Sequence, residues 1–133
     1  MVSPFSGSDR VVVPMPEEID AANSVQLGER LNLALLLGVP LVIADFTQTR
    51  FSDTSGAREL ALARGLAAEM KVELRAVVTS ASVLRAFELA GLDELPPVYP
   101  SLDAALAASP ASDDLRLLQR DLADPSSTPL GTV

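Results

Sequence analysis

A short apolar run at residues 41–46 constrains the fold more than any other stretch of the sequence. The run is apolar except at Asp45, and it lies between two segments with helical spacing. A continuous apolar run of this length, without alternation, is typical of a strand in a parallel sheet that is covered on both faces. The sequence therefore predicts such a strand at 41–46.

The rest of the chain alternates between predicted strands and predicted helices. Strands are expected at 11–13, 72–78 and 97–99, with helices from Asp20 or Asn23 to about Leu37 and at 59–70, 83–90 and 101–108. Regular alternation implies right-handed crossovers and a mostly parallel sheet. The predicted fold is one α/β domain over residues 10–108, with a small, mostly parallel sheet of about four strands and helices packed on it.

Individual residues predict the ends and faces of these elements. Pro14 and Pro16 either restrict the first strand to an edge of the sheet or end it, and residues 17–20 are expected to form a turn. Leu27, Leu31 and Leu35 lie four residues apart. They are therefore predicted to form the buried face of the first helix.

The composition changes at residues 109–133. Proline and serine become frequent there, and Leu115, Leu118 and Leu122 share one helical face after Ser112. The sequence predicts a C-terminal tail that contains either a short docking helix or a disordered segment with transient helicity.

Composition and charge argue against several functional classes. The formal charge of −8 disfavours a nucleic-acid partner, which needs a basic surface. Without His the chain forms no Ser-His-Asp site, and without Cys it has no disulfide or thiolate metal site. No apolar run approaches the roughly 18 residues that cross a bilayer. We therefore expect a cytoplasmic protein without a metal, a cofactor or a membrane segment.

The segment Phe51–Arg58 connects the apolar strand to the helix that follows it. Asp53, Thr54 and Ser55 succeed one another in this segment. Backbone N–H groups at a helix start are unpaired and favour negative charge. A hydroxyl here either carries a phosphate or only caps the helix, because Asp, Thr and Ser are all preferred N-cap residues.

Motifs along the chain resemble those of STAS domains, the sulfate-transporter and anti-sigma-factor-antagonist family. The family pairs an apolar strand ending in Asp-Leu with an Asp-Ser-Ser/Thr-Gly turn, and it has a Gly-Glu-Leu-Asp motif before them and a Leu-Thr-Gly-Leu…Val-Tyr-Pro-Ser ending. The segments that carry the resemblance are Glu18–Asp20, Leu41–Phe46, Phe51–Gly56, Ala86–Leu95 and Val98–Ser101. They follow one another in the family's order.

The resemblance implies a function for the hydroxyls. In the family's anti-anti-sigma members, the hydroxyl residue directly after the turn Asp is phosphorylated by a partner serine kinase, which is itself the anti-sigma factor. This position is Thr54 here, with Ser55 as the second choice. The resemblance implies a non-enzymatic protein that binds an anti-sigma serine/threonine kinase and is released when phosphorylated. The implied partner-binding residues are Asp20, Asp45, Asp53, Thr54, Ser55, Gly56 and Arg58.

Three positions depart from the family's pattern. Arg58 stands in the segment where the family has Gly-Leu-Gly, and it either pairs with a phosphate or clashes with the basic surface of an ordinary kinase partner. Thr54 replaces the more common Ser, and Glu17 stands where the family often has Gly.

Two alternatives to the phosphorylated antagonist stay open. One is a STAS-type interaction module without phosphorylation, such as an adaptor in a signalling or transport complex. The other, more distant, is an enzyme that uses Asp45 and Asp53 as paired carboxylates.

Overall fold

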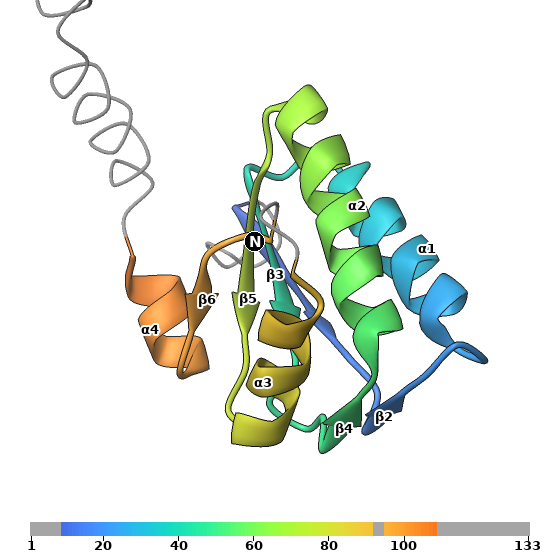
Figure 1. Ribbon diagram of the computed structural model, residues 1–133. Coiled ribbons are helices and arrows are strands. Elements are labelled where there is room, and N and C mark those ends of the chain that lie inside the picture. The colour runs from blue at the N-terminus through green and yellow to red at the C-terminus, as the bar shows by residue number, and fades with distance from the viewer. Residues whose placement is uncertain (1–8, 92–94, 109–133) are drawn as a thin grey trace, which may run out of the picture.

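A four-stranded sheet in the order β1-β3-β5-β6 forms the centre of the structure, a computed structural model that describes residues 9–91 and 95–108 (Figure 1). The strands are β1 (Arg10–Pro14), β3 (Leu41–Asp45), β5 (Glu73–Val77) and β6 (Val98–Tyr99). All three neighbouring pairs are parallel, with Val12 beside Ile43 and Ile43 beside Arg75. The predicted parallel sheet is therefore confirmed, and the strand that ends at Pro14 lies at its edge.

Helices cover both faces of this sheet. The helices are α1 (Ser24–Leu35), α2 (Thr54–Met70), α3 (Ala81–Leu89) and α4 (Leu102–Ala107). The first three share one face, whereas α4 lies on the other face beside β5 and β6 (Figure 1). This arrangement confirms the single α/β domain that the alternating elements predict.

The two faces of the central strand have separate cores. Val42 and Ala44 pack with the side chains of the first three helices, and Leu41 and Ile43 pack with Ala105 of α4. Successive residues of a strand point to opposite faces of the sheet. A continuous apolar run at β3 therefore fills both cores.

The helical spacing in the sequence predicts the buried faces of the helices. Leu27, Leu31 and Leu35 of α1 are at most 1% exposed. On α2, Leu60 and Ala63 are equally buried. Helix α1 ends at Leu35, two residues before the predicted end.

Two short strands were not predicted from the sequence. The expected turn at 17–20 contains β2 (Glu18–Ile19), which pairs in parallel with β4 (Phe51–Ser52). Helix α2 also begins at Thr54, five residues earlier than predicted, because the Asp53 side chain caps it. The segment before α2 is thus a paired strand and a helix start rather than a simple connection.

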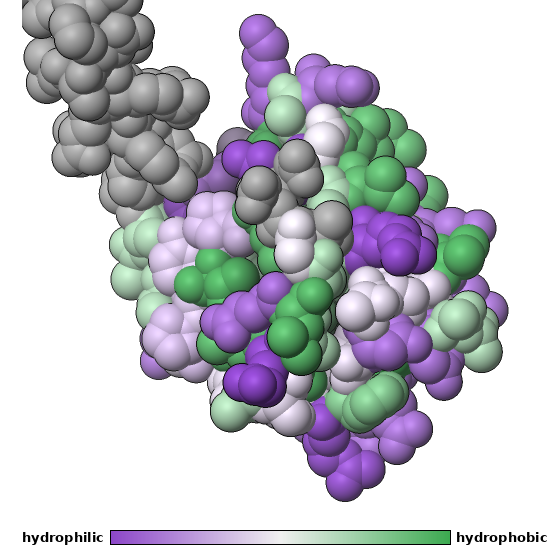
Figure 2. All heavy atoms as spheres, in the orientation of Figure 1, coloured by the Kyte–Doolittle hydropathy of each residue, from purple (hydrophilic) through white to green (hydrophobic). Residues whose placement is uncertain are grey.

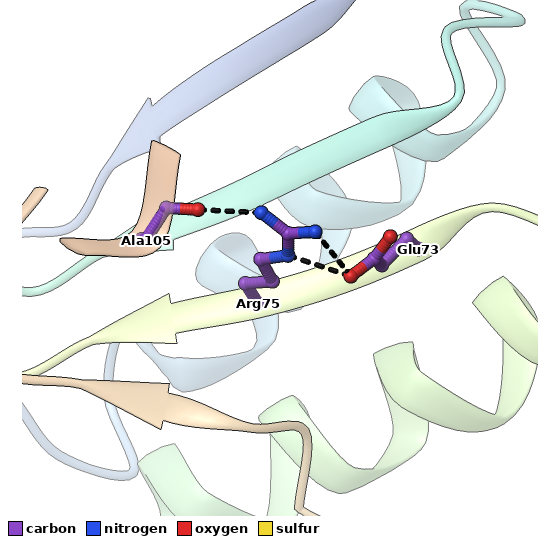
Figure 3. A network of polar contacts seen from close by, with 3 residues as sticks. All are labelled: Glu73, Arg75 and Ala105. Carbon is purple, nitrogen blue, oxygen red and sulfur yellow. Dashed lines mark hydrogen bonds and ion pairs between the residues drawn. The ribbon is translucent and has the colours of Figure 1, made fainter. Parts of the chain in front are cut away.

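One buried charge joins β5 to α4. The fully buried guanidinium of Arg75 donates from Nη1 to the carbonyl oxygen of Ala105 at 2.5 Å, and its Nε and Nη2 each lie 2.6 Å from Oε2 of Glu73 (Figure 3). The Ala105 carbonyl is among the last four of α4, which have no partner within the helix. Arg75 therefore supplies that partner from the sheet.

Some predictions fall on residues that the structure does not describe. They are the C-terminal tail at 109–133 and most of the turn expected at 92–95. No described helix has both the length and the apolar character to cross a bilayer.

Candidate functional site

The start of α2 is held in place by the pair of short strands. The backbone N–H of Asp53 donates to the carbonyl oxygen of Ile19 at 3.1 Å, and that of Arg50 donates to Glu17 at 2.8 Å. These bonds fix the chain on the N-terminal side of the helix. Thr54, the first residue of α2, therefore occupies a defined position.

Asp53 caps the helix through Ser55. One carboxylate oxygen, Oδ1, accepts the backbone N–H of Ser55 at 2.8 Å and its hydroxyl at 2.5 Å. These two bonds stabilise the charged carboxylate, and with a smaller contribution from the nearby charge of Arg58 they lower the pKa of Asp53 below its ordinary value. Asp53 is therefore the capping residue, and Ser55 is the residue that donates to it.

Thr54 differs from both of its neighbours. Its side chain is exposed, and within the described residues its hydroxyl forms no hydrogen bond. Ser55, in contrast, is only partly exposed, and its hydroxyl is bonded to Asp53. Of the two candidate hydroxyls, Thr54 is therefore the one that another molecule reaches without breaking a bond.

Gly56 allows the helix start to pack closely. It is buried, and a Cβ atom there would lie 3.2 Å from Cγ2 of Ile19 and even closer to Oγ of Ser52. Real Cβ atoms rarely approach other atoms so closely. A glycine at this position therefore lets α2 sit directly on the β2–β4 pair.

Arg58 lies four residues after Thr54 on the same helix. Both side chains are exposed. Arg58 forms no hydrogen bond or ion pair with any other described residue, although its charge acts on Asp53. Residues at this spacing are neighbours on a helix surface.

The other two predicted carboxylates take different places. Asp20 follows β2, so strand pairing brings it near Asp53; its carboxylate accepts the backbone N–H of Ala22 at 2.9 Å. Asp45 ends β3, is partly buried and accepts the backbone N–H of Thr47 at 2.9 Å. Asp20 therefore joins the site, whereas Asp45 stabilises a neighbouring turn.

The geometry does not support a pair of catalytic carboxylates. Asp45 and Asp53 each bind the backbone of their own turn, and no hydrogen bond joins the two turns through them. Among the described residues, no group of three or more acidic side chains could hold a metal ion.

An exposed aromatic side chain was missed by the sequence reasoning. Phe51 of β4 is 53% exposed, whereas its neighbour Ser52 is buried. Leu84 of α3, a helix that packs against β4, is 36% exposed. The only signal in the sequence is the alternation of Phe51 and Ser52, which is too short to predict a strand.

Apolar side chains reach the surface elsewhere as well. Figure 2 shows them among polar ones over α1 and α2. The exposed apolar residues on or directly after these helices are Val25, Leu33, Leu36, Leu37 and Leu62. Phe51 is thus not alone in being exposed, but it is the aromatic residue that lies close in sequence to Thr54.

Fold and site together define a parallel α/β domain that presents a side-chain hydroxyl at the start of a helix. The model of the STAS domain family matches residues 4–105. The chain therefore belongs to the STAS domain family. No curated protein sequence matched it.

Solved structures of other proteins share this fold. The chain is 26% identical to an anti-sigma factor antagonist from Mycobacterium paratuberculosis, with a TM-score of 0.65 and coverage of 73% of this chain and 82% of that one. It is 19% identical to the anti-sigma factor antagonist SpoIIAA in its unphosphorylated form, with a TM-score of 0.56 and coverage of 87% and 94%. A protein from Thermotoga maritima is 16% identical, with a TM-score of 0.63 and coverage of 74% and 85%.

Proposed function

We propose that this protein is an anti-sigma factor antagonist that acts in the cytoplasm by partner switching. Unphosphorylated, it binds an anti-sigma factor with serine/threonine kinase activity; phosphorylated on Thr54, it is released. The observation that carries this proposal is the exposed hydroxyl of Thr54, which lies at a fixed helix start and forms no hydrogen bond with the residues that the structure describes. Membership of the STAS family and the similarity to the Mycobacterium paratuberculosis antagonist support it.

The reaction itself belongs to the partner kinase. The Thr54 hydroxyl oxygen attacks the γ-phosphorus of the kinase's ATP, a new O–P bond forms, and the bond from that phosphorus to the β,γ-bridging oxygen breaks to release ADP. The hydroxyl proton passes to a base of the kinase. This chain supplies the acceptor alone and acts as substrate rather than enzyme.

The physical effect of the phosphate is local. It adds about −1.5 to −2 charges beside the carboxylate of Asp53, whose pKa is already low. Because Thr54 is exposed, the fold accommodates the added group. A partner surface that fits a neutral hydroxyl does not accommodate the phosphate, since repulsion between like charges and the cost of desolvation oppose contact. Phosphorylation therefore weakens binding without unfolding the domain.

The proposed binding surface surrounds Thr54. Its members are Asp20, Asp53, Thr54, Ser55, Gly56 and Arg58, with the Asp45 turn beside them and Phe51 as an added apolar contact. Aromatic residues are enriched at the centres of protein interfaces, where they fill pockets on the partner. The exposure of Phe51 gives the site an apolar contact that its charged residues lack.

Two experiments test the proposal. A pull-down from the native cell identifies whether an anti-sigma kinase co-purifies, and that kinase with ATP is then incubated with the protein for mass spectrometry. We expect one phosphate, on Thr54 in the wild type and in Ser55→Ala, and none in Thr54→Ala. We also expect Thr54→Asp to bind the kinase at least tenfold more weakly, because it places a negative charge on the surface.

The same experiments identify the alternative. A kinase that binds the protein but leaves Thr54 unmodified would remove the switch mechanism. If Thr54→Asp and Thr54→Ala also bound their partner like the wild type, the protein would be a STAS-type interaction module or adaptor without phosphorylation.

A further inference from the structure

Thr54 and Arg58 lie four residues apart on the exposed side of α2. They are the first and fifth residues of the helix, and both are exposed. Side chains four residues apart on a helix interact, and an acidic group placed N-terminal to a basic one is the better orientation. A phosphate on Thr54 would have this orientation relative to Arg58.

The two backbone donors that follow Thr54 are already occupied. The N–H of Ser55 donates to the Asp53 carboxylate, and the N–H of Gly56 donates to the Asp53 carbonyl oxygen at 3.3 Å. A phosphate on Thr54 therefore competes with the Asp53 cap for these groups. The guanidinium of Arg58 has five donors and no hydrogen-bonded partner among the described residues.

Other nearby charges serve the phosphate less well. Arg50 is 3.6 Å from a carboxylate oxygen of Glu17 and is thus already paired. Arg64 is exposed on the same helix but lies ten residues from Thr54. Among the described residues, Arg58 is the cation that combines a side chain without an ion pair or hydrogen bond with a position one turn from Thr54.

We propose that Arg58 is the internal counter-ion of a phosphate on Thr54. This inference rests on the proposed phosphorylation, and it adds a second change to it. In the unphosphorylated protein the guanidinium is available to a carboxylate on the partner. In the phosphorylated protein it pairs with its own chain, so the partner meets a negative group and also loses a positive one.

The test uses protein that carries phosphothreonine at position 54 from translation, so that no kinase is required. The second pKa of the phosphate is measured by ³¹P NMR titration in the wild type, Arg58→Gln, Arg58→Lys and Arg64→Gln. The energy of an exposed ion pair at this spacing predicts that the second pKa of the phosphate is higher by roughly 0.15 to 0.4 pH units in Arg58→Gln. Arg58→Lys retains a charge and should stay close to the wild type.

Arg64→Gln is the matched control because it removes the same charge from the same helix. It should leave the phosphate pKa within roughly 0.1 pH unit of the wild type, since the charge lies more than a Debye length from Thr54 along the helix. The remaining charged groups around the site, which are the same in all four proteins, are Glu17, Glu18, Asp20, Arg50, Asp53 and Glu59.

Equal pKa values of the phosphate in Arg58→Gln and Arg64→Gln would contradict the proposal that Arg58 is its counter-ion. The partner's affinity for the phosphorylated protein is a separate readout. If the phosphorylated protein bound the kinase as tightly as the unmodified protein, the result would contradict the proposed function. It would not contradict the ion pair between the phosphate and Arg58. The two proposals therefore fail on different measurements.

Discussion

Ser55 donates two hydrogen bonds to a single oxygen of Asp53, one from its backbone and one from its hydroxyl. This relationship assigns different roles to three consecutive polar residues. Asp53 and Ser55 are bonded to each other at the start of α2. Thr54, which lies between them, is left exposed.

Removing the Asp53 cap should destabilise the domain. Asp53→Ala leaves the N–H of Ser55 without its acceptor, and loss of an N-cap residue costs about 1 kcal/mol, within a range of roughly 0.5–2. Urea unfolding followed by circular dichroism measures this loss. Glu69→Ala, an exposed substitution in the last turn of α2, is the control and should stay within about 0.5 kcal/mol of the wild type. Equal stability of the two variants would show that the cap does not stabilise the fold.

The stabilisation by Asp53 should also depend on pH. Its pKa in the folded protein is below the ordinary value of 3.8, so the unfolded chain binds the proton first as pH falls. The charge therefore contributes fully above that ordinary value and is lost as pH falls through the lower, folded pKa. Asp53→Asn keeps a capping residue but removes the charge. The difference in unfolding free energy between the wild type and this variant should be largest near pH 7 and approach zero in strong acid.

The sequence predicts most of the sheet and helices because their patterns are local. The apolar run of β3 and the leucine spacing of α1 each report burial within one element. The strands β2 and β4 are two residues each, and Glu18 pairs with Phe51 across 33 positions of sequence. No pattern within either strand carries that information, since the pairing depends on the rest of the fold.

The geometry of the candidate site could be predicted from the sequence only in part. The motif around Thr54 indicates the correct turn, but only the structure shows that Ser55 is bonded and Thr54 is not. The exposure of Phe51 and the burial of Arg75 also depend on tertiary neighbours. Charged residues are rarely fully buried without a partner, so sequence reasoning places an arginine at the surface by default.

Gly56 and Gly65 should respond in opposite ways to alanine. Both lie in α2, where alanine is the better helix former by about 1 kcal/mol. Nothing lies near a Cβ atom at Gly65, so Gly65→Ala should stabilise the domain by roughly 0.5–1 kcal/mol. At Gly56 a Cβ atom meets Ser52 and Ile19, so Gly56→Ala should destabilise it by about 1–3 kcal/mol. Thermal and urea unfolding of both variants measure whether each substitution raises or lowers the free energy of unfolding.

A second substitution tests the cause of the Gly56 effect. The closest clash is with Oγ of Ser52. The double variant Ser52→Ala with Gly56→Ala should therefore lose less stability than the sum of the losses in the two single variants. Additive losses would mean that the contact with Ser52 is not the source of the strain.

Phe51 should matter for partner binding and not for the fold. Its side chain is 53% exposed, so Phe51→Ala removes little buried contact within the domain. At the centre of an interface, truncation of an aromatic residue costs about 1–2 kcal/mol or more, or roughly tenfold in affinity. Leu62→Ala is the control, because Leu62 of α2 is 63% exposed. Isothermal titration with the partner from the pull-down should show the loss for Phe51→Ala alone; equal affinities would exclude Phe51 from the interface.

The buried charge of Arg75 should be required for α4 to pack on the sheet. Arg75→Met leaves the Glu73 carboxylate without the guanidinium and the Ala105 carbonyl without its donor. Breaking a buried ion pair by removing one partner costs about 3–5 kcal/mol. Amide hydrogen exchange should therefore accelerate in α4 (Leu102–Ala107) before it does in α2.

Two further variants separate this ion pair from general effects of substitution. Arg85→Met changes an exposed arginine of α3 and should alter stability by no more than about 0.5 kcal/mol. Glu73→Leu combined with Arg75→Met removes both charges, and apolar replacement of a whole buried pair is often neutral or stabilising. The double variant should therefore be more stable than Arg75→Met alone. If it were less stable, the loss in Arg75→Met would come from packing and from the Ala105 bond rather than from the lost contact between Glu73 and the guanidinium.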